Sequence, residues 1–217
     1  MCVASEAFTD GTTPVLPYAL VALEGPAGCG KRALARWLAA RPGAAGLRLA
    51  PRMSEALEEL ASRQAGPGGQ RGRVPANLLH TASLVECAVQ FEYARETFAG
   101  ADLVVADRWL QTWEVYCGDL GEYAEWYLQI AAQVPAPDVL LYLRVSPRVA
   151  AARLARVLCR DEAALLRHTT ALCARYDEVM SGVDCVVVDA DAPAPAVLAH
   201  VAGVLREAGL AALLTAE

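Results

Sequence analysis

The sequence has no long hydrophobic run and no excess of positive charge. Although 55% of its 217 residues are apolar, no uninterrupted run approaches the roughly 18 residues that a membrane-spanning helix needs. The formal net charge of −6 argues against duplex nucleic acid as the main partner, because nucleic-acid-binding surfaces are basic. We therefore expect no membrane association and no stable nucleic-acid binding.

Paired cysteines and a signal peptide are also lacking. The seven cysteines are scattered and include no Cys-x-x-Cys pair, which fits buried, reduced thiols in a cytoplasmic protein better than a disulfide framework or a zinc site. The N-terminal residues lack the basic start and continuous apolar stretch of a signal peptide. We expect a flexible extension over 1–16, one domain over 17–210 and a tail over 211–217.

A glycine-rich stretch between a predicted strand and a predicted helix organises the chain. The apolar run Tyr18 to Leu23 predicts a buried strand, and Cys29 to Ala40 predicts a helix. Gly25 and Gly30-Lys31 have the spacing of a phosphate-binding loop, in which glycines let backbone N–H groups approach an anion closely. The predicted nucleotide-phosphate contacts are Gly25, Gly28, Cys29, Gly30, Lys31 and Arg32.

One position departs from this loop pattern. Phosphate loops usually follow the lysine with a serine or threonine whose hydroxyl binds Mg²⁺, and this chain has Arg32 there. An arginine cannot ligate a cation, so the loop supports a phosphate site more directly than it supports turnover. A strand-to-helix turn that merely needs glycines is the plainer alternative. Lys31 should reach outer phosphates and lie outside the core.

Short apolar runs alternate with helical segments along the rest of the chain. Such alternation is typical of an α/β fold with a parallel sheet, here of about five strands, covered by helices on both faces. Further strands are predicted over 47–50, 103–106, 139–143 and 186–188, and further helices over 54–64, 77–99, 119–133, 147–158, 161–180 and 195–208. The buried stripe predicted for the long helix at 77–99 consists of Leu78, Ala82, Val85 and Val89.

A second polar motif, Asp107-Arg108-Trp109, directly follows the strand at 103–106. Because the carboxyl ends of parallel strands meet at one edge of the sheet, we expect this motif near the glycine loop and near Pro51-Arg52. A carboxylate there can hold Mg²⁺ or accept a proton, and the adjacent guanidinium can bridge two phosphates. A surface ion pair at a strand end is the plainer alternative.

Together these motifs resemble the thymidylate kinase family of nucleoside monophosphate kinases. Glu24 to Lys31 is similar to the family's Glu-Gly-x-x-Gly-x-Gly-Lys loop, and Asp107-Arg108-Trp109 to its Asp-Arg-Tyr/His motif. Tyr116-Cys117-Gly118 is similar to its Tyr-Gln-Gly stretch. Cys159 to Glu162 is similar to its Asp-Arg-x-Glu lid, and Cys173 to Tyr176 to its Arg-x-Arg-Tyr motif.

The resemblance implies a P-loop NTPase-type sheet with a helical lid and ATP- and Mg²⁺-dependent phosphoryl transfer to a deoxynucleoside monophosphate, typically dTMP. It also implies that Asp107 lies near the metal and that a homodimer can form through the helix at 77–99. The implied catalytic residues are Lys31, Asp107, Arg108 and Arg160. Lid arginines Arg153 and Arg156 would join the nucleotide-binding set. The implied acceptor contacts are Arg52, Glu86, Gln90, Thr112 and Tyr116.

The acceptor site departs most from the family pattern. The family's Arg-Glu-Pro after the second strand corresponds to Leu49-Ala50-Pro51, and its phosphate-binding arginine in the long helix corresponds to Glu86. Three hypotheses stay open. The first is a thymidylate kinase in which Arg52, Arg95 or a lid arginine binds the acceptor phosphate. The second is a deoxynucleoside kinase in which Glu86 contacts a sugar or base. The third is a nucleotide-binding homologue without turnover.

Overall fold

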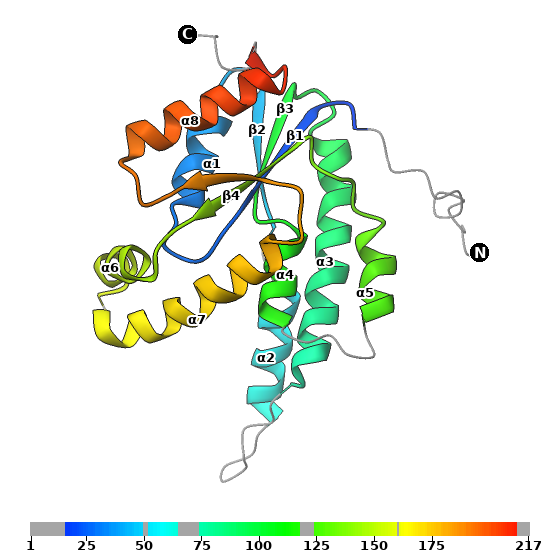
Figure 1. Ribbon diagram of the computed structural model, residues 1–217. Helices are drawn as coiled ribbons and strands as arrows, with labels where there is room; N and C mark the ends of the chain where they lie inside the picture. The colour runs from blue at the N-terminus through cyan, green and yellow to red at the C-terminus, as the bar shows by residue number, and fades with distance from the viewer. Residues whose placement is uncertain (1–15, 50–51, 65–73, 118–123, 160, 212–217) are drawn as a thin grey trace, which may run out of the picture.

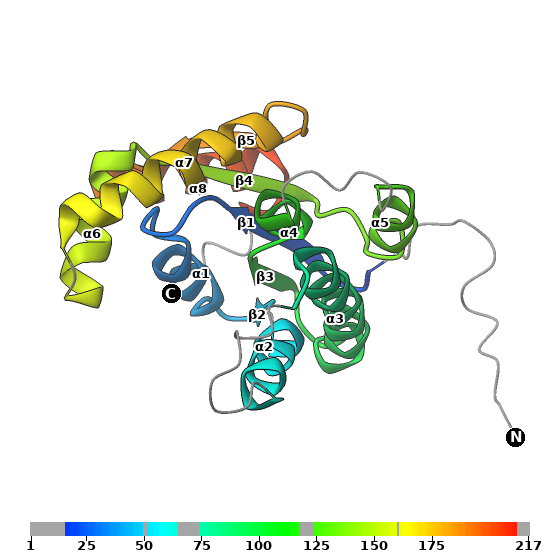
Figure 2. The same ribbon diagram turned by 90° about the horizontal axis from the view of Figure 1, so that it is seen from below.

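The computed structural model describes residues 16–49, 52–64, 74–117, 124–159 and 161–211. They form a five-stranded sheet in the order β2-β3-β1-β4-β5, in which all four strand pairs are parallel. Helices cover both faces of the sheet (Figures 1 and 2). The predicted α/β fold class is therefore confirmed. The predicted N-terminal extension and C-terminal tail lie almost wholly outside the described residues.

The strands become more exposed toward the edges of the sheet. They are β1 (Ala19–Glu24), β2 (Ala44–Arg48), β3 (Leu103–Asp107), β4 (Val139–Arg144) and β5 (Val186–Asp189). The central strands read as continuous apolar runs because helices cover both of their faces. The strand predicted over 47–50 was wrong at both ends, since β2 begins at Ala44 and ends at Arg48. Alanine and glycine are weak strand formers, so the start of β2 could not be recognised from the sequence.

Eight helices occur among the described residues. They are α1 (Lys31–Ala39), α2 (Arg52–Gln64), α3 (Ala76–Thr97), α4 (Leu110–Cys117), α5 (Ala124–Ala131), α6 (Pro147–Leu158), α7 (Glu162–Met180) and α8 (Ala194–Glu207). The sequence did not predict α4, because its 8 residues are too few for a clear helical period. None of these helices is both long and apolar enough to cross a membrane.

Two apolar clusters lie on opposite faces of the sheet. Helices α1 and α8 pack on one face, where Leu38 and Val201 contact Val21 and its neighbours. Helices α3, α4, α5 and α7 pack on the other, where Phe91 and Tyr176 join the cluster around Ala22. Figure 2 shows α1 and α3 on opposite sides of the central strands. Helices α6 and α7 lie side by side at one end of the molecule in both views.

The buried side of α3 is not the predicted one. Leu84, Cys87 and Phe91 are each 1% exposed, whereas Leu78 is 51% and Val89 48% exposed. The helix carries apolar residues on more than one side, so periodicity alone could not decide which side faces the sheet. One apolar side of α3 is thus left uncovered by the described residues of this chain.

A pair of leucine truncations tests this orientation of α3. Leu84→Ala should lower the free energy of unfolding by about 2–5 kcal/mol, because it opens a cavity against the sheet. Leu78→Ala, the same chemical change on the exposed side, should change it by no more than about 0.5 kcal/mol. Urea denaturation of both variants at low protein concentration measures the difference, and equal losses would contradict the orientation described above.

Candidate active site

The loop between β1 and α1 approaches neighbouring backbone so closely that two positions require glycine. Gly25 and Gly28 have φ angles of 141° and 87°. A Cβ at Gly25 would lie 2.6 Å from the carbonyl oxygen of Leu143, and one at Gly28 would lie 2.7 Å from that of Ala150. At Gly30, in contrast, a Cβ would meet no atom within 4 Å. The loop is therefore packed against β4 and α6 but open at the start of α1.

The N-terminus of α1 is suited to bind an anion. Gly30 precedes the helix in a left-handed conformation, no side chain caps the first turn, and no acidic residue occurs in it. Among the residues that the structure describes, no side chain thus neutralises these N–H groups or the positive end of the helix dipole. Arg32 is exposed on this turn, and Cys29 is buried beneath the loop. The strand, the glycine loop and the helix follow one another in the predicted order.

Lys31 is buried, contrary to the expectation that it lies outside the core. Its side chain is only 6% exposed, and its ammonium donates to the carbonyl oxygens of Gly25 and Pro26, the second at 3.1 Å. Its Nζ also lies 3.5 Å from the Sγ of Cys29. Loop carbonyls replace water around the charge, which keeps its burial from being costly. Lys31 is also the only lysine among the 19 lysine and arginine residues of the sequence.

The end of β3 lies beside the start of the loop, as predicted. Strand pairing sets Leu23 opposite Asp107, and the N–H of Arg108 donates to the carbonyl oxygen of Leu23 at 3.1 Å. Asp107 is buried, and strand alternation places it on the same face as Val105, which is the face covered by α1. The glycine loop and the Asp-Arg motif therefore share one edge of the sheet.

Arg108 has an unusual backbone conformation and a protected charge. Its φ of 89° is rare for a residue other than glycine, so the surrounding contacts must hold it there. Burial works to lower the pKa of Arg108, but the hydroxyls of Tyr176 and Tyr116 and the carboxylate of Asp107 outweigh it. The pKa of Arg108 consequently lies above its ordinary value. The guanidinium stays charged throughout the physiological range.

Glu24 is a buried carboxylate at this edge. It belongs to the glycine-loop motif, but the sequence predicted no role for it at the site. It is 0% exposed and accepts the N–H groups of Trp109 at 2.9 Å and Thr112 at 2.7 Å, and the hydroxyl of Thr112 at 2.7 Å. Burial raises the pKa of Glu24, and the bonds from Thr112 and the charge of Lys31 act in the opposite direction. Thr112, predicted to contact the acceptor, is fully buried, and its hydroxyl lies between Glu24 and Tyr176.

Of the residues predicted to bind the acceptor, Glu86 and Gln90 are bonded to each other, whereas Arg52 and Tyr116 are exposed. Glu86 accepts the N–H of Met53 at 2.7 Å and the side-chain amide of Gln90 at 2.9 Å, so it caps the start of α2 from α3. Arg52 is exposed at that helix start, and Tyr116 is 44% exposed on α4. Glu86 therefore has a structural partner that its spacing from Asp107 did not indicate.

Arg48 is a further basic residue at this edge, and the sequence predicted no role for it. It is the last residue of β2, is exposed, and stands opposite Asp107 in the pairing of β2 with β3. The strand predicted over 47–50 placed Arg48 inside the strand and not at its carboxyl end, whereas β2 ends at this residue. Recognising it required the register between the strands, which the sequence does not reveal.

One lid arginine is tied to the loop. The guanidinium of Arg153, on α6, donates to the carbonyl oxygens of Ala190 at 2.9 Å and Gly28 at 3.4 Å. It thereby links α6 to the glycine loop and to the end of β5. Arg156 is exposed on the same helix, and Arg160 lies outside the described residues.

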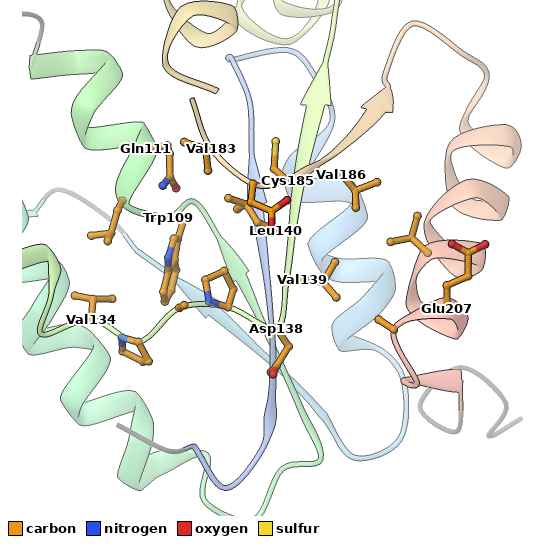
Figure 3. A pocket seen from close by; sticks show the side chains of 17 residues that line it. Trp109, Gln111, Val134, Asp138, Val139, Leu140, Val183, Cys185, Val186 and Glu207 are labelled. Carbon is orange, nitrogen blue, oxygen red and sulfur yellow. The ribbon is translucent and has the colours of Figure 1, made fainter. Parts of the chain in front are cut away.

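A sizeable cleft lies away from the glycine loop. Its volume is about 670 Å³, and it opens near the amino ends of β4 and β5. In Figure 3, Trp109 and Val134 lie on one side of the cleft and Glu207, on α8, lies on the other. None of the described residues that line the cleft belongs to the glycine loop, and they include three carboxylates and no lysine or arginine. Nothing in this lining is suited to hold a phosphate.

The chemistry of the edge and the topology of the sheet define a P-loop nucleotide kinase. The glycine loop, the Asp-Arg motif on the adjacent strand and the helix pair α6–α7 occur together in one parallel sheet. A family model described as an AAA domain matches residues 20–194. Thymidylate kinase from two strains of Xanthomonas oryzae pv. oryzae, PXO99A and MAFF 311018, is 30% identical over 190 residues, covering 82% of this chain and 79% of the relative. The chain therefore belongs to the AAA-domain family of P-loop proteins and to the thymidylate kinase family.

Solved structures agree on the fold. Deoxyadenosine kinase from M. mycoides with bound dCTP aligns with a TM-score of 0.59 at 15% identity, over 87% of this chain and 99% of that one. The same enzyme with the products dCMP and dCDP aligns with a TM-score of 0.60 at 17% identity, over the same shares. At such identities the likeness concerns the fold alone.

Two glycine substitutions test the close packing of the loop. Gly28→Ala should reduce ATP affinity by at least about tenfold, because the new Cβ collides with the carbonyl oxygen of Ala150 and the positive φ is strained. Gly203→Ala, in the middle of α8 with open space around it, should instead stabilise the protein by about 0.5–1 kcal/mol and leave ATP affinity unchanged. Calorimetric titration and thermal unfolding measure both effects. Unaltered ATP affinity in Gly28→Ala would contradict the assignment of the glycine loop to the ATP site.

Proposed function

We propose that this chain is an ATP-dependent kinase that phosphorylates a deoxynucleoside monophosphate, converting dTMP to dTDP. The observation that carries the proposal is the pairing of β1 with β3, which sets the glycine loop beside Asp107 and Arg108. Phosphoryl transfer requires positioned cations around the phosphates far more than covalent chemistry. An anion-binding helix start, an ammonium and a charged guanidinium at one edge meet that requirement.

Each group at this edge has a role in the proposed transfer. The loop N–H groups bind the ATP phosphates, and Lys31 exchanges its bonds to the carbonyls of Gly25 and Pro26 for bonds to the outer phosphates. Arg108 bridges donor and acceptor phosphates through its fork of N–H donors. Arg153, held by the loop and by Ala190, anchors the lid helix α6 over the nucleotide.

Mg²⁺ fits this site through a single protein carboxylate. The described residues contain no group of three or more His, Cys, Asp or Glu side chains that could hold a metal. Mg²⁺ in kinases is commonly held by one or two carboxylates together with the substrate phosphates and water. Asp107 is the carboxylate that would hold it here, while Arg32 offers no ligand. The ion would neutralise charge on the phosphates that it accompanies.

The arrangement around Glu86 supports a monophosphate acceptor. A free carboxylate would repel the acceptor phosphate, but Glu86 is engaged with the N–H of Met53 at the positive end of α2. Arg48 and Arg52 supply positive charge at the same edge of the sheet. Together these two arginines take the place of the arginine that the family carries in its long helix.

A deoxynucleoside kinase is the second candidate. The observation that favours it is the hydrogen bond of 2.9 Å between Gln90 and Glu86, which orients an amide and a carboxylate on one face of α3. Such a pair can bind the hydroxyl of a sugar or the edge of a base. In this case the acceptor would carry no phosphate, and Glu86 would be a specificity residue.

A homodimer through α3 is also part of the proposal. Leu78, Val89 and Tyr93 are 51%, 48% and 71% exposed on the uncovered side of this helix. A hollow of about 250 Å³ lies on the same side, lined by Ala88, Val89, Glu92, Tyr93, Glu96 and Gln133. An exposed apolar side next to a hollow is typical of a surface that meets a partner. The proposed partner is the same surface of a second copy.

Coupled-assay turnover tests the proposed activity. With ATP and Mg²⁺, dTMP should be the best acceptor in a panel of deoxynucleosides and their monophosphates. Lys31→Met, which keeps the side-chain length and removes the charge, should lower kcat/KM for dTMP by at least about 100-fold, because a phosphate contact of the transition state is lost. Arg206→Met, on the exposed end of α8, is the control and should leave turnover unchanged.

Other outcomes of the turnover assay would favour other functions. Turnover of deoxynucleosides alone would favour the second candidate. ATP binding without turnover on any acceptor would show a nucleotide-binding homologue that is not a kinase. Since Lys31 is buried, the circular dichroism and melting temperature of Lys31→Met must match those of the wild type for its loss of turnover to count.

Light scattering after size-exclusion chromatography tests the dimer. The wild type should elute with twice the 23.0 kDa mass of one chain, and Val89→Arg should elute as a monomer because a charge is buried in the interface. Val157→Arg, at a position 78% exposed on α6, should remain dimeric. A wild type that stays monomeric at all concentrations would remove the proposed interface.

A further inference from the structure

Glu24 connects three parts of the site through buried hydrogen bonds. Its Oε2 accepts the N–H of Gly25, the first glycine of the phosphate loop, at 3.3 Å. Its Oε1 accepts the N–H groups of Trp109 and Thr112 at 2.9 and 2.7 Å, and Oε2 also accepts the hydroxyl of Thr112 at 2.7 Å. The donors of Trp109 and Thr112 belong to the first residues after the Asp-Arg motif and to the first turn of α4. A carboxylate at that place satisfies the free N–H groups of the helix start and interacts favourably with its dipole.

These bonds surround the strained residue. Arg108, with its φ of 89°, lies between two fixed points: its own N–H is bound to the carbonyl of Leu23, and the next N–H, of Trp109, is bound to Glu24. A positive φ at an arginine persists only where its surroundings over-determine it. Leu23 and Glu24 are consecutive residues of β1, so the strand that leads into the phosphate loop also sets the backbone of Arg108.

The same network reaches the second lid helix. The hydroxyl of Thr112 lies 3.0 Å from that of Tyr176 on α7, and the ring of Tyr176 stacks on Tyr142 of β4. Tyr142 in turn donates to Asp177 at 2.8 Å. Tyr176 is fully buried and also lies close enough to Arg108 to influence its pKa. Glu24 is thus the point at which the loop, the Asp-Arg motif and α7 are joined.

We infer that Glu24 is a positioning residue for the phosphoryl transfer, which holds the guanidinium of Arg108 in place by binding the N–H groups of Trp109 and Thr112. The inference rests on the proposed kinase function. Glu24 itself touches no substrate, because it is fully buried and both of its oxygens are occupied. Its effect on catalysis passes through the geometry of Arg108.

Three variants separate this role from a general effect on stability. Glu24→Ala removes the acceptor and should lower kcat by about 100-fold, because a misplaced phosphate-binding group costs on that order. Glu24→Gln retains an oxygen for the two N–H groups, and its amide can donate to the hydroxyl of Thr112, so kcat should stay within about tenfold of the wild type. Glu114→Ala removes a half-buried carboxylate from the same helix α4 and should leave kcat unchanged.

Comparing the loss of kcat with the loss of nucleotide affinity distinguishes a positioning role from damage to the phosphate loop. ADP affinity and the KM for ATP should change much less than kcat in Glu24→Ala. Glu24 meets the loop only through the longer bond from the N–H of Gly25 at 3.3 Å, whereas it binds the N–H groups of Trp109 and Thr112 at 2.9 and 2.7 Å. Equal losses in Glu24→Ala and Glu24→Gln, or a loss of ADP affinity that matches the loss of kcat, would overturn the inference. Full kcat in Glu24→Ala would overturn it as well.

Hydrogen exchange provides a readout that does not require activity. Amide exchange of the segment 107–113, followed by mass spectrometry, should be at least about tenfold faster in Glu24→Ala and nearly unchanged in Glu24→Gln, because only the first loses the acceptor for two N–H groups. Unaltered exchange in a folded Glu24→Ala would refute the inference whether or not the enzyme is active. Absence of turnover in the wild type with the expected exchange pattern would instead remove the proposed function and leave the role of Glu24 in holding Arg108.

Discussion

The parallel pairing of β1 with β3 is the constraint on which the rest of the site depends. It sets Leu23 opposite Asp107 and lets the N–H of Arg108 bind the carbonyl of Leu23. Two motifs that are far apart in the sequence thereby meet at one edge of the sheet. A shift of the register by one residue would move Asp107 to the opposite face and separate it from α1. The apolar side chains of the central strands prevent such a shift, because each must stay within its own cluster.

The two faces of the sheet contribute different parts of the site. Asp107 points to the face of α1, where the glycine loop and its uncapped helix start can receive an anion. Glu24 points to the other face, where it binds the start of α4 and, through Thr112, approaches α7. The edge therefore combines a side that meets the ligand with a side that keeps the ligand-binding groups in position. Because β1 ends between the two, it is the structural link between them.

The sequence was sufficient for the class of fold and for the loop, because both depend on local patterns. Continuous apolar runs indicated the central strands, and the glycine spacing indicated a loop whose demand for glycine the structure explains at Gly25 and Gly28. Features that depend on distant partners could not be predicted. The amides that bind Glu24 and the strand register that places Arg48 beside Asp107 appear only in three dimensions. The buried side of α3 was ambiguous because the helix is apolar on two sides.

The solitary lysine has a consequence for how this protein responds to amine chemistry. Arginine provides every other fixed positive side chain, so Lys31 is the one side-chain amine in the sequence that an amine-directed acylating reagent can modify. Acetylation of Lys31 would remove its charge and replace an ammonium, which donates in three directions, with an amide that donates in one. A modification that is dispersed and tolerated on most protein surfaces would therefore be concentrated here on the phosphate loop itself.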